Sequence, residues 1–341
     1  MQTFPAKHPE NSDGALPENP GTENSVPEVS SVFQETCEVS GDTAMRHATD
    51  KTAFVSPDAG KASGAEHKTD FPVLGMFDSH AHYYDKKFDA LPGGADALLE
   101  KLFESGEVEK IINVATNPEN TELCVKMAAR YPGMYVAAGI HPEDCEAYPD
   151  TDAALSALYE RISPEKVRRR DKIVAIGEIG LDYYWKPHDK KKQADFFDAQ
   201  MAFAAGLGLP VIIHDREAHG DCFETVLRYP QVRGVFHSYS GSAEMARELI
   251  RRGWYISFSG VVTFKNASRV REVAASVPAD RLLIETDCPY LAPHPHRGEI
   301  NHSGLMRYTA EVLAGVHRMS VAELVGRTKE NAETLFGLQE S

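Results

Sequence analysis

The chain has 341 residues, of which 42% are hydrophobic and 26% are charged, a composition typical of a globular protein. It holds 51 acidic against 36 basic residues, for a net charge of -15. This acidity excludes a protein that holds nucleic acid through a broad basic surface. A phosphate-bearing substrate would have to be bound locally, by metal ions or a few cations. Every apolar run is shorter than the roughly 18 residues needed to cross a bilayer, and we expect no membrane segment.

The five cysteines are scattered and form no Cys-x-x-Cys pair. This pattern argues against a disulfide scaffold or a thiolate zinc site, and it favours a reducing, cytoplasmic location. The first residues lack the basic start and apolar stretch of a secretory signal, so we expect none.

Residues 1–70 differ in composition from the rest of the chain. They hold 12 acidic and 5 basic residues, are rich in Pro, Glu, Ser, Thr and Gly, and contain few apolar residues. Such a segment buries too little apolar surface to offset its ordering entropy. We predict a disordered acidic extension over 1–70, followed by a folded domain over 71–341.

From residue 71 the pattern alternates between strands and helices. Eight short apolar or β-branched runs are predicted as strands: 75–82, 110–116, 134–141, 173–182, 210–216, 234–240, 254–262 and 281–290. Helices are predicted to begin at Asn117-Pro118, Asp189 and Ser242, which carry N-terminal boundary signals. Eight such units in about 265 residues predict an α/β fold of the TIM (β/α)8 barrel type. A doubly wound sheet is the alternative.

Polar side chains gather at the C-terminal ends of the predicted strands, where the catalytic groups of such barrels collect. In "MFDSHAHYYD" the two histidines are two residues apart, so on a strand both point the same way and can reach one metal ion. The residues at these ends are His80, His82, His141, Glu178, His214, His237, Glu285 and Asp287. We interpret most of them as metal ligands, whereas His141 could also be a loop-capping residue and Glu285 an orienting one.

At these motifs the sequence resembles the TatD-like metal-dependent deoxyribonucleases, a family of amidohydrolase-type barrels. The resemblance covers about residues 76–336 through "DSHAH", "GIHP", "GEIGLDYY", "VIIHDRE", "FHSYSG", "IETDCPYLAP" and "PHRG". It implies one divalent ion held by His80, His82, Glu178 and Asp287. A second ion would be held by Glu178, His214 and His237, with Glu178 as the bridge.

The chemistry of these side chains agrees with that assignment. Imidazole and carboxylate ligands without thiolate suit Mg, Mn, Zn or Co, and two such ions can clamp the oxygens of a phosphodiester. We expect Asp287 to act as general base beside the catalytic Glu178. His141 and Arg216 are expected to hold the substrate phosphate, and Arg297 is either a further phosphate contact or a surface arginine.

The favoured function is therefore a metal-dependent deoxyribonuclease that acts on DNA ends or single strands, which fit a barrel opening better than long duplex does. Some motifs depart from the family pattern: "HAHYYD", "HPE", Cys288 and "PHRGEINHS" replace its more usual residues. Because fold does not determine function, two alternatives stay open. One is hydrolysis of another ester or amide, such as an aminoacyl-tRNA ester or a small lactone. The other is an added partner-binding role of the N-terminal arm.

Overall fold

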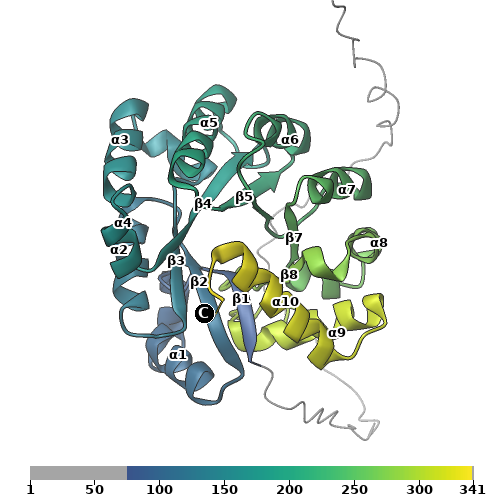
Figure 1. The fold of residues 1–341 in the computed structure, drawn as a ribbon. Coiled ribbons are helices and arrows are strands. Elements are labelled where there is room, and N and C mark those ends of the chain that lie inside the picture. Colours follow the sequence, from purple (N-terminus) through teal and green to yellow (C-terminus); the bar gives the residue numbers. More distant parts are fainter. Residues whose placement is uncertain (1–74, 340–341) are drawn as a thin grey trace, which may run out of the picture. The chain divides into compact units, whose positions relative to one another are not determined.

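The computed structural model describes residues 75–339, and the extension predicted for 1–70 lies outside them. The predicted barrel is confirmed: eight parallel strands follow one another in chain order around a single sheet (Figure 1). The strands are β1 (Met76–Ala81), β2 (Val108–Val114), β3 (Met134–Ala138), β4 (Ile173–Asp182), β5 (Val211–Arg216), β6 (Gly234–Phe236), β7 (Tyr255–Phe258) and β8 (Leu282–Ile284). The segment after β8 closes the ring, because Asp287 N donates to His80 O (2.9 Å) and His82 N to Cys288 O (2.8 Å).

Helices surround the strands (Figure 1). The α-helices are α1 (Gly94–Glu104), α2 (Pro118–Ala128), α3 (Thr151–Ile162), α4 (Glu165–Arg170), α5 (Lys190–Leu207), α6 (His219–Leu227), α7 (Ala243–Arg251), α8 (Ser268–Ser276), α9 (Met306–His317) and α10 (Val321–Phe336). Short 3-10 helices lie in the connections: η1 (Lys86–Ala90), η2 (Pro142–Ala147), η3 (Gly260–Thr263), η4 (Ala279–Arg281) and η5 (Ser303–Leu305). Within residues 75–339, no helix combines the length and the apolar character that a membrane crossing requires.

The three predicted helix starts are confirmed by their caps. Asn117 accepts a hydrogen bond from the backbone of the third helical residue of α2, with proline at the first position. Asp189 and Ser242 accept in the same way at the starts of α5 and α7. Each side chain satisfies an N–H group that has no partner within its own helix.

The last three strands are shorter than the sequence predicts. β6, β7 and β8 end at Phe236, Phe258 and Ile284, whereas the sequence predicts strands that end at 240, 262 and 290. Ser238 and Asp287 have backbone φ angles of 40° and 58°, in the left-handed region, so the extended ladder cannot continue through them. His237 and Asp287 therefore lie on turns that follow the strands.

The barrel is closed at the end where its strands begin. Phe77 and Leu283 from the strands pack there with Ala332 and Phe336 of α10, which lies across one end of the barrel (Figure 1). Asn331 of α10 donates to two backbone carbonyls beside the start of β8 (2.8 Å each). We call the opposite end, where the strands finish, the mouth; it carries the polar side chains.

Candidate metal centre

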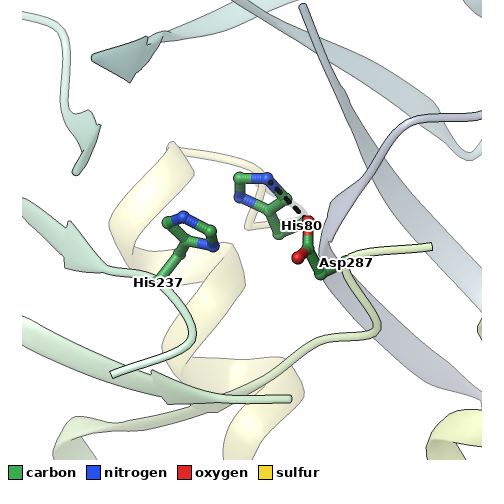
Figure 2. A group of neighbouring side chains, drawn as sticks. All are labelled: His80, His237 and Asp287. Carbon is green, nitrogen blue, oxygen red and sulfur yellow. Dashed lines mark ion pairs between the residues drawn. The ribbon is translucent and has the colours of Figure 1, made fainter. Parts of the chain in front are cut away.

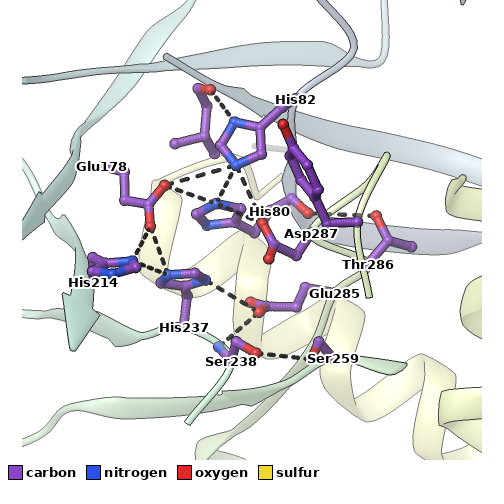
Figure 3. Close-up of polar contacts among 12 residues, drawn as sticks. His80, His82, Glu178, His214, His237, Ser238, Ser259, Glu285, Thr286 and Asp287 are labelled. Carbon is purple, nitrogen blue, oxygen red and sulfur yellow. Dashed lines mark hydrogen bonds and ion pairs between the residues drawn. The ribbon is translucent and has the colours of Figure 1, made fainter. Parts of the chain in front are cut away.

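Seven side chains that could hold a metal ion meet at the mouth, His141 and the six predicted ligands, and Figures 2 and 3 draw the six. The six predicted ligands lie in β1, β4 and β5 or within three residues after β1, β6 and β8: His80, His82, Glu178, His214, His237 and Asp287. Their side chains are at most 17% exposed. The structure thus brings together every residue that the sequence predicts as a metal ligand.

The first group of ligand atoms joins His80 of β1 and His82, which directly follows β1, with two carboxylates. Nε2 of His80 and Nε2 of His82 lie 3.0 Å apart. Glu178 Oε2 lies 3.4 Å from the first nitrogen and 3.7 Å from the second. Asp287 Oδ1 lies 3.7 and 3.2 Å from the same two atoms. Ligand atoms that share one ion at about 2.1 Å stand about 3 to 4 Å apart, so these four atoms fit around a single divalent ion.

The second group uses the other oxygen of Glu178. Its Oε1 lies 2.7 Å from His214 Nδ1 and 2.7 Å from His237 Nε2 (Figure 3). These two nitrogens are 3.3 Å apart. One carboxylate thus presents an oxygen to each group, which is the arrangement a bridging ligand needs.

The outer nitrogens of two of these histidines determine which nitrogen can bind an ion. His82 Nδ1 lies 2.7 Å from Val114 O, and a carbonyl only accepts, so Nδ1 carries the proton and Nε2 keeps its lone pair. His214 Nε2 lies 2.9 Å from Asp182 Oδ2, which in the same way leaves the lone pair on Nδ1. In both residues the free lone pair is the one that faces Glu178.

The carboxylate of Glu285 lies next to His237 Nδ1, the ring nitrogen that does not contact Glu178. Glu285 Oε1 lies 3.4 Å from His237 Nδ1 and accepts a hydrogen bond from Ser238 N (2.7 Å), as Figure 3 shows. Glu285 is fully buried. It therefore takes the orienting position that the sequence suggests for it.

The electrostatics of the centre favour cations. Burial alone would raise the pKa of Glu178, but the surrounding histidines hold it well below its usual range. Burial opposes a charge on His214, yet its hydrogen bonds to Asp182 and Glu178 raise its pKa to about 9. The carboxylates thus favour positive charge on the rings beside them, and an ion bound at His214 Nδ1 would take the place of the proton there; the imidazole and carboxylate donor set fits divalent ions.

His141 lies beside the second group with the opposite protonation pattern. Its Nδ1 accepts a hydrogen bond from Glu143 N (3.1 Å), so the ring proton sits on Nε2, which lies 3.6 Å from Glu178 Oε1. Burial lowers the pKa of His141 to about 3, so the ring is neutral at pH 7. A neutral ring with its N–H toward the centre can donate to an anionic oxygen but offers no lone pair to an ion.

The two predicted arginines lie farther out. Arg216 ends β5, two residues after His214, and its Cζ lies 4.1 Å from the ring centroid of Tyr184. Arg297 lies after β8, with its Cζ 4.2 Å from the ring centroid of Phe264. It lines a pocket of about 400 Å³ with three other polar side chains: Lys265, Asn266 and His294.

The sequence reasoning missed two supporting carboxylates. Asp182 is four residues after Glu178 on the same strand, and this even spacing was the available signal. Asp78, two residues before His80, is fully buried and accepts hydrogen bonds from Thr286 Oγ1 (2.6 Å) and Ser303 Oγ (2.7 Å). Burial raises the pKa of Asp78 to about 6 despite these donors. Asp78 ties β1 to the segment after β8 and so positions His80 relative to Asp287.

Comparison with known proteins identifies the family to which the chain belongs. The family described as TatD related DNase matches residues 77–337. The chain belongs to the TatD family. It is 39% identical to the uncharacterized metal-dependent hydrolase YabD of Bacillus subtilis over 264 residues, which cover 76% of this chain and 98% of that protein. It is 35% identical to the uncharacterized metal-dependent hydrolase YcfH of Escherichia coli, over 78% of this chain and 97% of that protein.

Solved structures agree with the family and the fold. The TatD homologue YjjV of Escherichia coli superposes with a TM-score of 0.69 at 30% identity, covering 79% of this chain and all of YjjV. A TatD family hydrolase from Entamoeba histolytica, at 21% identity and a TM-score of 0.68, shares the fold over 79% of this chain and all of that one. This TatD-family protein is thus a metal-dependent hydrolase.

Proposed function

We propose that this TatD-family hydrolase is a phosphodiesterase that removes nucleotides from DNA ends or single strands. The observation that carries the proposal is the neutral Nε2–H of His141 beside the Glu178 carboxylate. This N–H is a hydrogen-bond donor 3.6 Å from Glu178 Oε1, and we expect a substrate phosphate oxygen to bind beside it. It strengthens its bond as negative charge builds on that oxygen.

The two groups of ligand atoms support a proposal of two metal sites. His80, His82, Glu178 and Asp287 would hold one divalent ion, and Glu178, His214 and His237 would hold the other. Mg, Mn, Zn and Co all suit such a mixed imidazole and carboxylate set. When bound, these ions supply Lewis acidity and lower the pKa of water.

Asp287 is the proposed general base. Burial raises its pKa, but the hydrogen bond from His82 and the charges of the neighbouring histidines outweigh this and lower it. The carboxylate is therefore ionised at pH 7 and can accept a proton from the attacking water. Within residues 75–339, its contacts to the histidines run through Oδ1, which leaves Oδ2 for that proton.

The negative charge of the chain limits the forms of DNA that it can bind. With a net charge of -15, the protein cannot hold long duplex through its general surface. Arg216 and the Arg297 pocket offer cations near the mouth, sufficient for a few phosphates. A strand end or a single strand can be held through contacts to these few phosphates.

The test compares two substrates and two variants. We expect the full chain with Mn or Mg to degrade a labelled linear single-stranded oligonucleotide and to lose this activity in a chelator. Asp287→Asn should lower turnover about a hundred-fold or more, because it removes the base and keeps the shape. His141→Ala should lower turnover on DNA and have little effect on 4-nitrophenyl acetate, which develops no phosphate charge.

Lys172→Ala, at the closed end of the barrel, is the matched control and should keep wild-type turnover. Hydrolysis of the neutral ester with intact DNA would overturn the proposal in favour of another esterase. Equal loss of both activities in His141→Ala would overturn the role of the Nε2–H group.

A further inference from the structure

Large apolar side chains are exposed at the mouth. Among the described residues, six large hydrophobic side chains are strongly exposed, and three of them follow strands at this end: Tyr184 (45%), Trp185 (52%) and Tyr290 (41%). The other three lie on surface helices. Exposed aromatic rings beside a catalytic site are typical of stacking surfaces for nucleobases.

The loop that carries Tyr184 and Trp185 is held in place. Asp182 Oδ1 accepts hydrogen bonds from Tyr184 N (2.9 Å) and Trp185 N (3.1 Å). The second oxygen of Asp182 lies 2.9 Å from His214 Nε2. One carboxylate thus connects the aromatic loop directly to the metal centre, so the rings have a defined position relative to it.

Arg216 completes the surface. Its Cζ lies 4.1 Å from the ring centroid of Tyr184 and 5.4 Å from that of Trp185. The two rings meet edge to face, with centroids 4.9 Å apart and planes at 84°. Arg216 is exposed and has no carboxylate partner among residues 75–339. The face of its guanidinium is covered by Tyr184, whereas the N–H groups at its edge remain available to a phosphate.

We propose that Trp185, supported by Tyr184 and Arg216, is a stacking subsite for an unpaired nucleobase, next to the phosphate that Arg216 holds. The inference rests on the proposed function and names its substrate more closely. A base inside a duplex has both faces covered by its neighbours and cannot stack on Trp185, whereas an unpaired base has a face to offer. The subsite therefore favours single-stranded ends over the interior of a duplex.

Binding to the subsite can be measured without hydrolysis. The chain has two tryptophans, Trp185 and Trp254, and Trp254 is only 2% exposed. We expect dAMP to quench the fluorescence of the metal-loaded full chain and of Trp254→Phe. The probe that lacks a base, 2-deoxyribose 5-phosphate, should cause no quenching and, in calorimetry of both probes, bind about ten-fold more weakly, a difference in the range of single-base stacking.

Variants separate stacking from phosphate binding. Trp185→Ala should reduce the affinity for dAMP to that of the sugar phosphate and leave the latter unchanged, whereas Trp185→Phe should keep most of the difference. Tyr159→Ala removes an aromatic ring of similar exposure (40%) from α3 and should leave both affinities unchanged. Equal affinity of the wild type for the two probes would overturn the subsite.

Measuring DNA cleavage and dAMP binding together distinguishes this inference from the function on which it rests. If the chain cleaves no DNA but dAMP still quenches Trp185, the subsite is supported and the nuclease proposal fails. If the chain cleaves oligonucleotides and Trp185→Ala leaves KM and dAMP binding unchanged, the nuclease proposal stands and the subsite is overturned.

Discussion

Asp182→Asn tests whether the tautomer of a histidine controls the metal centre. In the wild type, Asp182 Oδ2 faces His214 Nε2–H while Oδ1 accepts the N–H groups of Tyr184 and Trp185. The asparagine side chain has only one oxygen. If this oxygen faces the loop, it keeps the two hydrogen bonds from Tyr184 N and Trp185 N, whereas facing His214 would keep only one. Its NH2 group then faces His214 Nε2, which must accept, and the ring proton moves to Nδ1. That atom, 2.7 Å from Glu178 Oε1, would lose its lone pair.

The expected loss of metal affinity follows from the contribution of groups that orient a metal-ligating histidine. Groups that orient a metal-ligating histidine typically contribute 10- to 100-fold in metal affinity, or about 1.4 to 2.7 kcal/mol. We expect the dissociation constant of the ion at His214 and His237 to rise by about this factor. The ion at His80 and His82 should be affected far less, since Asp182 does not contact that group in the described part of the chain.

Competition between the protein and a calibrated chelator, followed by calorimetry, measures the two affinities separately. Asp96→Asn is the control, because Asp96 pairs with the exposed Arg130 on the outer helices and should leave both affinities unchanged. Wild-type affinity at both groups in Asp182→Asn would refute the reasoning from the tautomer of His214.

Three further outcomes are expected. Glu178→Ala should lower the bound divalent metal from about two ions per chain to less than one after dialysis, because each group loses an oxygen; full occupancy by elemental analysis would contradict a bridge. Lys172→Ala should reduce the free energy of unfolding in urea by about 1 to 2 kcal/mol with kcat unchanged, because its Nζ donates to three carbonyls at the end of α2 and just after it, at 2.9 to 3.1 Å. Burial lowers the pKa of His302 to about 4 from 6.5, so the unfolded chain binds a proton that the folded chain excludes, and stability should fall as pH drops from 6.5 to 4. His302→Gln should flatten that dependence of Tm, and an unchanged slope would contradict it.

Much of the candidate site follows from local pattern. The spacing of two in His80-Ala81-His82 places both rings on one face of a strand whatever the rest of the fold does. The strand pattern predicts a barrel, and a barrel brings the ends of distant strands to one opening, where Glu178, His214 and Asp287 meet. The early ends of β6 and β8 could not be predicted, because the left-handed backbone that ends them falls on Ser238 and Asp287 and not on glycine.

The sequence by itself determined the barrel, the family and the types of side chain at the mouth, because these depend on periodicity and residue identity along the chain. Only the tertiary structure decided which oxygen of Glu178 faces which pair of histidines, and that His141 presents an N–H where His214 presents a lone pair. It also decided that Arg216 lies against Tyr184. The physical reason is that a hydrogen-bond partner or a stacked ring comes from another strand or loop, and its distance exists only once the barrel has closed.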